Sequence, residues 1–465
     1  MKALIDVRPT AEQLALFSRI NPGVEIIRGA AGSGKTTTAL LKLRAAIGFY
    51  LNRRRRQVSP KQVNVLILTF NKTLRGYIQE LASKQVPQGN EVCIDISTFD
   101  AWARRLCGKR NILSIDQTQT ILEGLIGNSF PDRKFIADEA SYVMGRFPLS
   151  ALDDYISARR DGRGTSPRME RTSRQLLLEK VIHPYIEYKK KIGYVDWNDL
   201  AVDLSINKYF GYDVIVVDET QDFSANEIRA VLNQASTEST ITFVLDSVQK
   251  IYSRGFTWSE VGVSIRPENS HKLSINYRNT RQIAALAAAL LSGIRTDEDG
   301  SIPNLNGVSR DGNTPLVISG DYAKQVEYCV SYIKKNIDLK SESVAFLHTK
   351  GWFRDLIPVL SAQSLGFKII QGRAEWPTGS ENIALTTFHS AKGLEFDHVI
   401  MVGLDGVILN STNINDLEHE DTVKLRKLIA MGIGRARESV IIGFSHNDIP
   451  SISSCFEGVT EWVTL

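Results

Sequence analysis

The sequence has few cysteines and no long apolar segment. Its four cysteines, Cys93, Cys107, Cys329 and Cys455, lie far apart and form no C-x-x-C pair, so neither a zinc site nor a disulfide framework is indicated. No apolar run approaches the roughly 18 residues that a membrane-spanning helix needs, and the opening MKALIDVRPT lacks the apolar core of a signal peptide. We therefore expect a cytoplasmic protein with no membrane partner.

An excess of positive charge is also lacking, because the net charge is only +4 over 465 residues. This balance by itself is weak evidence for a polyanionic partner. Basic residues do gather in three runs, at 53–56, 159–163 and 189–191. Such runs are more often solvated surface than ligand sites, and the functional alternative is contact with a phosphate backbone.

The length predicts more than one lobe, since single hydrophobic cores stop growing near about 250–300 residues. Apolar runs that resemble strands alternate with helical stretches, as in doubly wound parallel sheets. The region 107–194 interrupts this pattern because it is polar, charged and helical in character. We predict a first α/β lobe from 1–106 and 195–277, a small helical insertion at 107–194, and a second α/β lobe at 278–465. The expected strands are 24–27, 63–69, 92–97, 214–217, 240–245, 316–319, 343–348, 367–370, 383–386, 399–402 and 440–443.

The segment Gly29–Thr36 reads GAAGSGKT and fits the phosphate-loop pattern G-x-x-x-x-G-K-[ST]. It lies between an apolar strand and a helix-forming stretch that begins at Thr37, which is the context that this loop requires. Backbone N–H groups and the helix N-terminus would surround the phosphates of ATP, with Lys35 at the β- and γ-phosphates. Thr36 is a candidate Mg²⁺ ligand. The residues expected to hold nucleotide here are Gly29, Gly32, Ser33, Gly34, Lys35, Thr36 and Thr37.

A second motif, Val214–Asp222 (VIVVDETQD), is an apolar strand that ends in two adjacent carboxylates. Open α/β sheets bind ligands at the carboxyl ends of their strands. We predict that Asp218 holds Mg²⁺ and that Glu219 is the base that orients or deprotonates the attacking water.

Further motifs follow in a fixed order, and together they give a resemblance that covers almost the whole chain. The sequence resembles superfamily 1A helicases of the UvrD/Rep type, which implies two RecA-like P-loop NTPase lobes with ATP and Mg²⁺ bound between them. The segments that carry the resemblance, besides the two motifs above, are LTFNKT (68–73), STFDAW (97–102), DSVQKIY (246–252), NYRN (276–279), TFHSAKGLEF (387–396) and MGIGRAR (431–437).

The resemblance assigns roles in the ATP site to residues of both lobes. Gln13 matches the glutamine that reads adenine, and Tyr277 the ring that stacks on it. Arg278 and Arg435 match arginines that stabilise charge on the γ-phosphate from the second lobe, so that hydrolysis depends on lobe closure. Gln249 matches the residue that reports the γ-phosphate to the DNA track. The remaining nucleotide contacts implied are Gly393 and Glu395, the latter at the ribose.

Single-stranded nucleic acid is bound by basic grooves that carry aromatic platforms for base stacking. The candidate contacts are Phe70, Asn71, Thr98, Phe99, Trp102, Tyr252, Trp258 and His389. Aromatic residues next to apolar strands are usually core residues, so about half of the aromatic candidates are expected to be packing residues.

The sequence departs from the family pattern in three places. Only a short segment around 375–381 separates two strands where UvrD and Rep carry the large helical subdomain 2B, so we predict a compact form without 2B. The aromatic cluster near Tyr252 and Trp258 cannot be matched position by position. Gly434 replaces a threonine before Arg435, and a glycine within a helix would loosen it by about 1 kcal/mol relative to alanine.

These features favour an ATP-dependent translocase or helicase on single-stranded DNA or duplex–single-strand junctions, with 3′ to 5′ direction implied by the resemblance alone. A bare motor of this kind fits the motor subunit of a nuclease–helicase system in repair or anti-phage defence. Two alternatives stay open: a DNA- and nucleotide-state sensor ATPase that regulates a partner nuclease without moving along DNA, and an RNA substrate. The sequence does not define an oligomeric state.

Overall fold

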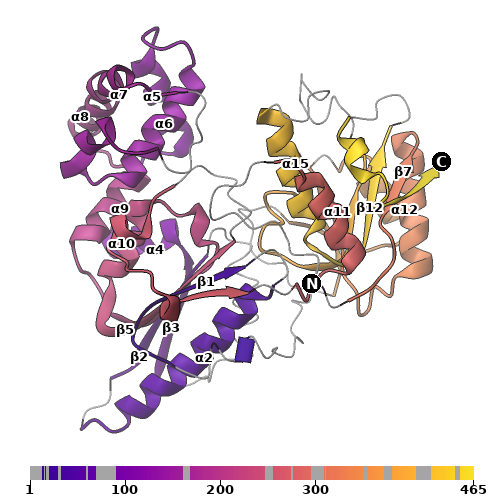
Figure 1. The fold of residues 1–465 in the computed structure, drawn as a ribbon, viewed down its shortest axis with the longest axis horizontal. Helices are drawn as coiled ribbons and strands as arrows, with labels where there is room; N and C mark the ends of the chain where they lie inside the picture. The colour runs from indigo at the N-terminus through magenta and orange to yellow at the C-terminus, as the bar shows by residue number, and fades with distance from the viewer. Residues whose placement is uncertain are drawn as a thin grey trace.

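The computed structural model describes residues 13–14, 16, 20–29, 33–58, 61–69, 91–160, 168–246, 255–273, 276–294, 308, 310–349, 351, 353–370, 380–404, 420–445 and 451–465. Two parallel β-sheets, each covered by helices, form the two halves of the molecule (Figure 1). A separate group of helices, α5 to α8, extends from the half that contains the N-terminal sheet.

The first sheet has six strands in the order β3-β2-β4-β5-β1-β6, and all neighbouring strands run parallel. Its central strand β4 is buried at every residue, as expected for a parallel sheet with both faces covered. The strands are β1 (Gly23–Gly29), β2 (Val63–Thr69), β3 (Val92–Thr98), β4 (Tyr212–Val217), β5 (Ala235–Asp246) and β6 (Ser270–Leu273).

Alternating residues of these strands face two different helix layers. On one face, Val65 and Val214 share an apolar cluster with α2 (Lys35–Arg54). On the other face, Leu66 and Ile215 share a second cluster with α4 (Phe99–Cys107), α9 (Trp197–Ile206) and α10 (Ala225–Asn233). The two-residue period of a strand thus places the sheet between two helix layers.

The second sheet has seven parallel strands in the order β13-β7-β12-β11-β8-β10-β9. Helices α11 (Arg281–Leu291) and α15 (Glu420–Ile433) share the apolar cluster on one face, while α12 (Tyr322–Asn336) and α13 (Leu356–Ala362) cover the other. The strands are β7 (Leu316–Ser319), β8 (Val344–His348), β9 (Phe367–Ile370), β10 (Ile383–Thr387), β11 (Phe396–Met401), β12 (Ala436–Phe444) and β13 (Glu461–Thr464).

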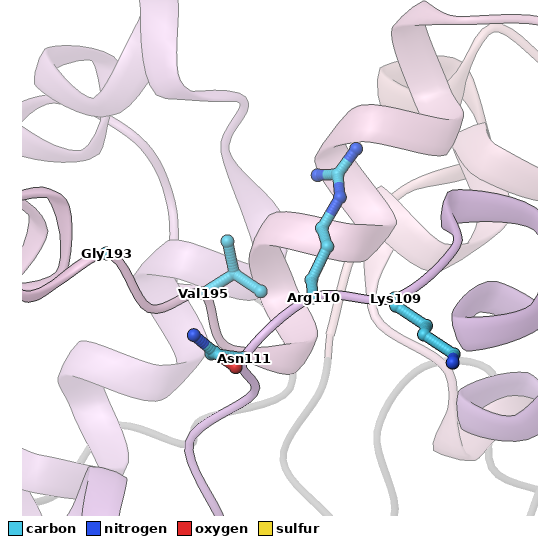
Figure 2. Close-up of a pocket in the computed structure, with 5 residues that line it drawn as sticks. All are labelled: Lys109, Arg110, Asn111, Gly193 and Val195. Carbon is cyan, nitrogen blue, oxygen red and sulfur yellow. The ribbon is translucent and has the colours of Figure 1, made fainter.

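The helical group has an apolar core of its own. Its helices are α5 (Ile115–Ile126), α6 (Arg133–Arg146), α7 (Arg171–Leu177) and α8 (His183–Ile192). Figure 2 shows the two connecting segments, Lys109–Asn111 and Gly193–Val195, which line a hollow of about 420 Å³. The segments are joined by a parallel bridge between Ile112 and Val195, so the chain enters and leaves the helical group at one point.

Hydrogen bonds also hold the helical group against α10. The side-chain amide of Asn226 donates to the carbonyl oxygens of Met144 and Phe147 at 2.9 and 3.0 Å. Arg146 lies 2.5 Å from Glu260, and this ion pair is largely buried on the arginine side. These contacts fix the end of α6 on the first lobe.

The predicted fold class, two α/β lobes with parallel sheets flanked by helices, is confirmed. All eleven expected strands are present, with ends that differ by up to five residues from the predicted ranges. Strands β6 (SHKL) and β13 (EWVT) were not predicted, because neither four-residue segment is a continuous apolar run. The division at residues 106, 194 and 277 stays a prediction. Among the described residues, none of the helices is both long and apolar enough to cross a membrane.

Candidate ATP site between the two sheets

The predicted phosphate loop joins the end of β1 to the start of α2. Gly34 precedes the helix with φ of +73°, a left-handed conformation that favours glycine. A Cβ atom at this position would lie 2.4 Å from Nε2 of Gln13, so a larger residue would also displace the glutamine. The loop residue Gly32 lies outside the described residues. The described part has the left-handed glycine and the helix N-terminus that suit an anionic phosphate.

Side chains predicted to contact ATP gather on this loop. Gln13 is buried, and its Nε2 donates to the carbonyl oxygen of Ser33 at 3.3 Å. Nζ of Lys35 donates to the carbonyl oxygen of Gly29 at 2.8 Å, so the lysine lies over its own loop. Thr37 follows in the first turn of α2. The structure therefore brings the predicted adenine-reading residue and the predicted phosphate-binding lysine to the same loop.

Asp218, which directly follows β4, contacts the end of the phosphate loop. Oγ1 of Thr36 donates to Oδ2 of Asp218 at 3.0 Å, and the backbone N–H of Glu219 donates to Oδ1 at 3.0 Å. Burial and the nearby carboxylate of Glu219 raise the pKa of Asp218 above its ordinary value. A hydroxyl and a carboxylate at this distance are the oxygen ligands that Mg²⁺ prefers, and a bound cation would favour the ionised carboxylate.

Glu219 adopts a backbone conformation that is rare for a residue with a side chain. Its φ is +53°, and it precedes the short 3₁₀ helix η3 (Thr220–Asp222). A non-glycine residue in this region costs on the order of 1–3 kcal/mol and persists where its surroundings hold it in place. The side-chain amide of Gln221 donates to Oε2 of Glu219. The predicted base is thus held at both its backbone and its carboxylate.

Residues of the second lobe that were predicted to contact ATP cluster around the end of α15. Arg278 forms an ion pair with Glu395 and donates from Nη1 to the carbonyl oxygen of Gly434 at 3.3 Å. Arg435 is buried, and its Nε donates to the carbonyl oxygen of Met431 at 3.3 Å. Tyr277 is half-buried beside Arg278. The structure therefore joins the predicted γ-phosphate arginine to the predicted ribose ligand.

Two glycines shape this part of the second lobe. Gly393 has φ of +80°, so the turn between β10 and β11 needs a residue without a side chain at this position. Gly434 lies beyond Ile433, the last residue of α15. The expectation that Gly434 loosens a helix is therefore wrong, because the residue stands after the helix, where its carbonyl oxygen accepts from Arg278.

Lys392 lies in the segment TFHSAKGLEF (387–396), but no role is predicted for it from the sequence. Lys392 belongs to the second lobe, and its Nζ lies 2.5 Å from Oδ2 of Asp222 and 3.7 Å from Oε2 of Glu219 in the first lobe. Its side chain is only 2% exposed. Lys392 is thus buried between two carboxylates of the other lobe. The spacing of motifs in the sequence cannot reveal such a contact.

Two of the predicted base-stacking residues belong to the hydrophobic core. Trp102 is fully buried, and its Nε1–H donates to the hydroxyl of Tyr212 at 3.1 Å. The ring of Phe99 is 5% exposed and packs edge-on against Trp102 and Phe223. Both aromatic faces are covered by protein, so the expectation that Phe99 and Trp102 stack on bases is corrected to a packing role.

The other candidate nucleic-acid contacts differ in exposure. His389 is exposed, and Trp258 is half-buried with its ring centroid 5.1 Å from that of Phe243. Oγ1 of Thr98 accepts from the backbone N–H of Ala101 and so caps α4. Contact of these three residues with nucleic acid stays a prediction. Three of the candidate nucleic-acid contacts, Phe70, Asn71 and Tyr252, lie outside the described residues, and so does Gln249 of the predicted ATP site.

Much of the positive charge in the three basic runs is matched by carboxylates of the protein. Arg160 makes a bidentate ion pair with Glu139 at 2.7 and 2.8 Å, deep in the helical group. Lys189 is buried between Asp196 and Asp199 at 2.7 and 2.6 Å. In the first run, the pairs are Arg53 with Glu238, Arg54 with Asp213 and Arg55 with Glu91. These contacts favour the structural alternative over phosphate binding for the paired residues.

Comparison with protein families gives two matches along the chain. Residues 12–254 match the model of an AAA domain, and residues 354–447 match the model of the UvrD-like helicase C-terminal domain. The first match covers the phosphate loop and the strand-end carboxylates. The second covers the segment with Lys392 and Glu395 as well as the end of α15.

Two curated proteins of Mycoplasma pneumoniae are similar to the chain. One, a probable DNA helicase II homolog, is 23% identical over 307 residues, which cover 60% of this chain and 41% of that protein. The other, a probable DNA helicase, is 22% identical over 456 residues, which cover 90% of this chain and 80% of that protein. The chain thus matches less than half the length of the first relative.

Among solved structures, one similar chain is the C-terminal domain of a possible DNA helicase from Lactobacillus strain WCFS1. The TM-score is 0.30 at 19% sequence identity, and the match covers 40% of this chain and 98% of that chain.

Proposed function

The chain belongs to the UvrD-like helicase family, and from that premise we propose that it is an ATP-dependent motor on single-stranded DNA. The observation that carries the proposal is the contact between Thr36 of the phosphate loop and Asp218 at the end of β4. Lys392 of the second lobe lies beside the next carboxylate, that of Glu219. Groups that would bind and hydrolyse a nucleotide are thus held together where the two lobes meet.

Residues of the first lobe would bind the nucleotide and prepare water for attack. The N-terminus of α2 and Lys35 would hold the phosphates, while Gln13 would recognise the base. Glu219, fixed by its backbone and by Gln221, would orient the attacking water and take its proton. Each role uses a group that already lies at the carboxyl end of the first sheet.

Mg²⁺, when held by Thr36 and Asp218, would neutralise charge on the phosphates. The residues present fit this ion, because a hydroxyl and a carboxylate lie 3.0 Å apart and both are oxygen ligands. They also fit a triphosphate, because the N-terminus of α2 and the ammonium group of Lys35 lie on the same loop.

Arg278 and Arg435 would complete the site from the second lobe. Arg278 now pairs with Glu395, so binding of the ribose by Glu395 would release the arginine for the γ-phosphate. Hydrolysis would then require both lobes, which is the property that a motor needs to couple turnover to movement.

The nucleic-acid part of the proposal rests on the family and on its named relatives. We propose single-stranded DNA or a duplex–single-strand junction as the track, with movement 3′ to 5′. Strands β9 and β10 are separated only by residues 371–382, which supports a compact form without the 2B subdomain. Segment 371–379 within that interval lies outside the described residues.

The test is steady-state ATPase activity with and without single-stranded DNA, with Glu219→Gln as the blank. Stimulation of the wild-type protein by DNA supports the motor. ATP binding without any stimulation would contradict it and favour the alternative, a sensor subunit that switches a partner without moving. A parallel titration with RNA of the same length separates the two substrates.

Movement itself needs a separate measurement, because both the motor and the sensor hydrolyse ATP. Fluorescently end-labelled single strands of increasing length report the arrival of a moving protein at the label. Arrival times that lengthen with strand length support translocation. Times that do not depend on length would support the sensor.

A partner nuclease, in repair or in defence against phage, is the remaining part of the proposal. A compact motor without 2B fits a role as one subunit of a larger machine. Purification from the native host tests this idea, since a nuclease should accompany the chain in stable stoichiometry. A chain recovered alone under mild conditions would count against it.

A further inference from the structure

Lys392 connects the second lobe to two carboxylates of the first, those of Asp222 and Glu219. It stands in the turn between β10 and β11, directly before Gly393, whose left-handed backbone shapes the turn. Its Nζ lies 2.5 Å from Oδ2 of Asp222 and 3.7 Å from Oε2 of Glu219. The side chains of Lys392 and Asp222 are 2% and 0% exposed, so the charges interact with little screening by water.

The two carboxylate oxygens of Glu219 differ in their contacts. Both Gln221 and Lys392 approach Oε2. Among the described residues, no donor contacts Oε1, which leaves that oxygen for the attacking water. A carboxylate held by one oxygen cannot rotate freely, and its other oxygen then has a fixed direction.

We propose that Lys392 is a positioning residue that sets the direction of Glu219 from the second lobe. The inference rests on the proposed function, because it takes Glu219 as the base for ATP hydrolysis. Asp222 fixes the ammonium group of Lys392, and the ammonium group in turn holds Oε2 of Glu219. Since Lys392 and Glu219 belong to different lobes, the base is aligned only when the lobes are in contact at this point.

The alternative role of Lys392 is to neutralise the buried charge of Asp222. A lysine with that role alone would matter for folding and would have no separate effect on catalysis. The two roles are separable by removing both charges together. The double variant Lys392→Met/Asp222→Asn removes the charge of Asp222 together with that of Lys392, yet it still lacks the ammonium group beside Glu219.

The chain offers a matched control in Lys189 of α8, which is likewise buried between two carboxylates, Asp196 and Asp199 at the start of α9. The experiment compares Lys392→Met, Lys189→Met and the double variant Lys392→Met/Asp222→Asn. Four quantities are measured for each protein: kcat, KM for ATP, the affinity for a fluorescent ATP analogue, and the thermal unfolding midpoint.

We expect kcat of Lys392→Met to fall about 10- to 100-fold, since a small displacement of a catalytic group costs up to that much. Its KM and its affinity for the analogue should stay within about 3-fold, because the contact orients the base and does not bind ATP. Lys189→Met should lose thermal stability but keep its kcat. The double variant should regain thermal stability and remain slow.

Return of kcat to the wild-type value in the double variant would overturn the proposal, since Lys392 would then only neutralise Asp222. An equal loss of kcat in Lys392→Met and Lys189→Met would overturn it too. Absence of DNA stimulation in the wild-type protein is a different result, because it contradicts the motor. The comparison of basal kcat among the variants would still decide the role of Lys392.

Discussion

Thr36 and Asp218, which are 182 positions apart in the sequence, are joined by a hydrogen bond of 3.0 Å. Thr36 belongs to the first turn of α2, and Asp218 directly follows β4. The contact aligns the phosphate loop with the strand that ends in two carboxylates. A parallel sheet makes this possible because the carboxyl ends of its strands share one edge.

From this contact we predict that Asp218→Asn will weaken magnesium binding and leave the stability of the fold nearly unchanged. The amide oxygen of asparagine can accept from the backbone N–H of Glu219 while its NH2 group donates to the hydroxyl of Thr36, so the free energy of unfolding should change by no more than about 1 kcal/mol. ATPase activity should fall on the order of 100-fold or more, because the anionic ligand for Mg²⁺ is lost. Urea denaturation and steady-state ATPase over a range of Mg²⁺ concentrations test both parts. Full activity at ordinary Mg²⁺ would contradict the role of Asp218.

Lys35 and Glu219 are predicted to act at different steps. Lys35→Ala should abolish ATP binding or turnover, because the cation at the β- and γ-phosphates is removed. Glu219→Gln should still bind ATP and DNA, yet hydrolysis should slow about 10²- to 10⁴-fold, the range for loss of a general base. Nucleotide binding measured by fluorescence, beside single-turnover hydrolysis, separates the two variants. Normal turnover in Glu219→Gln would refute its assignment as the base.

The parts of the fold that sequence predicts well are those with a strong local pattern. Strands β2, β7 and β9 begin and end at the predicted residues, because each is an apolar run between polar segments. Strand β6, with the sequence SHKL, has no such pattern. It pairs with β1 through backbone hydrogen bonds, which carry no signal in the side chains.

The residues of the site also differ in how well the sequence predicts them. The glycines and Lys35 of the phosphate loop are recognisable because the pattern is continuous in sequence. The contact of Lys392 with Asp222 joins residues 170 positions apart, so only the folded chain reveals it. Trp102 shows the reverse case, since an aromatic residue beside basic ones suggests a base-stacking platform until its burial is known.

Arg435 is predicted to act in the closed state of the two lobes. Arg435→Ala should lower kcat about 10²-fold or more, while the affinity for ATP should change by less than about 3-fold. Arg437, two positions later, is a suitable control because it is partly exposed and lies 3.7 Å from Asp397, within the second lobe. Arg437→Ala should keep its kcat. Equal losses of kcat and ATP affinity in Arg435→Ala would indicate a structural or ground-state role.

Substitution of Trp102 is predicted to lower chiefly the stability of the fold, and substitution of Trp258 to lower chiefly the affinity for DNA. Trp102→Ala should destabilise the fold by about 3–5 kcal/mol, since it empties a fully buried site and leaves the hydroxyl of Tyr212 without its indole donor. The folded fraction should bind single-stranded DNA as the wild type does.

Trp258→Ala should cost less stability, because the ring is only half-buried against Phe243. If the ring stacks on a base, DNA affinity should fall by about 1–3 kcal/mol. Urea denaturation and fluorescence anisotropy with a labelled single strand measure the two effects on the same samples. A greater loss of DNA affinity in folded Trp102→Ala than in Trp258→Ala would reverse the assignment, since a ring enclosed by protein cannot stack on a base unless the core opens.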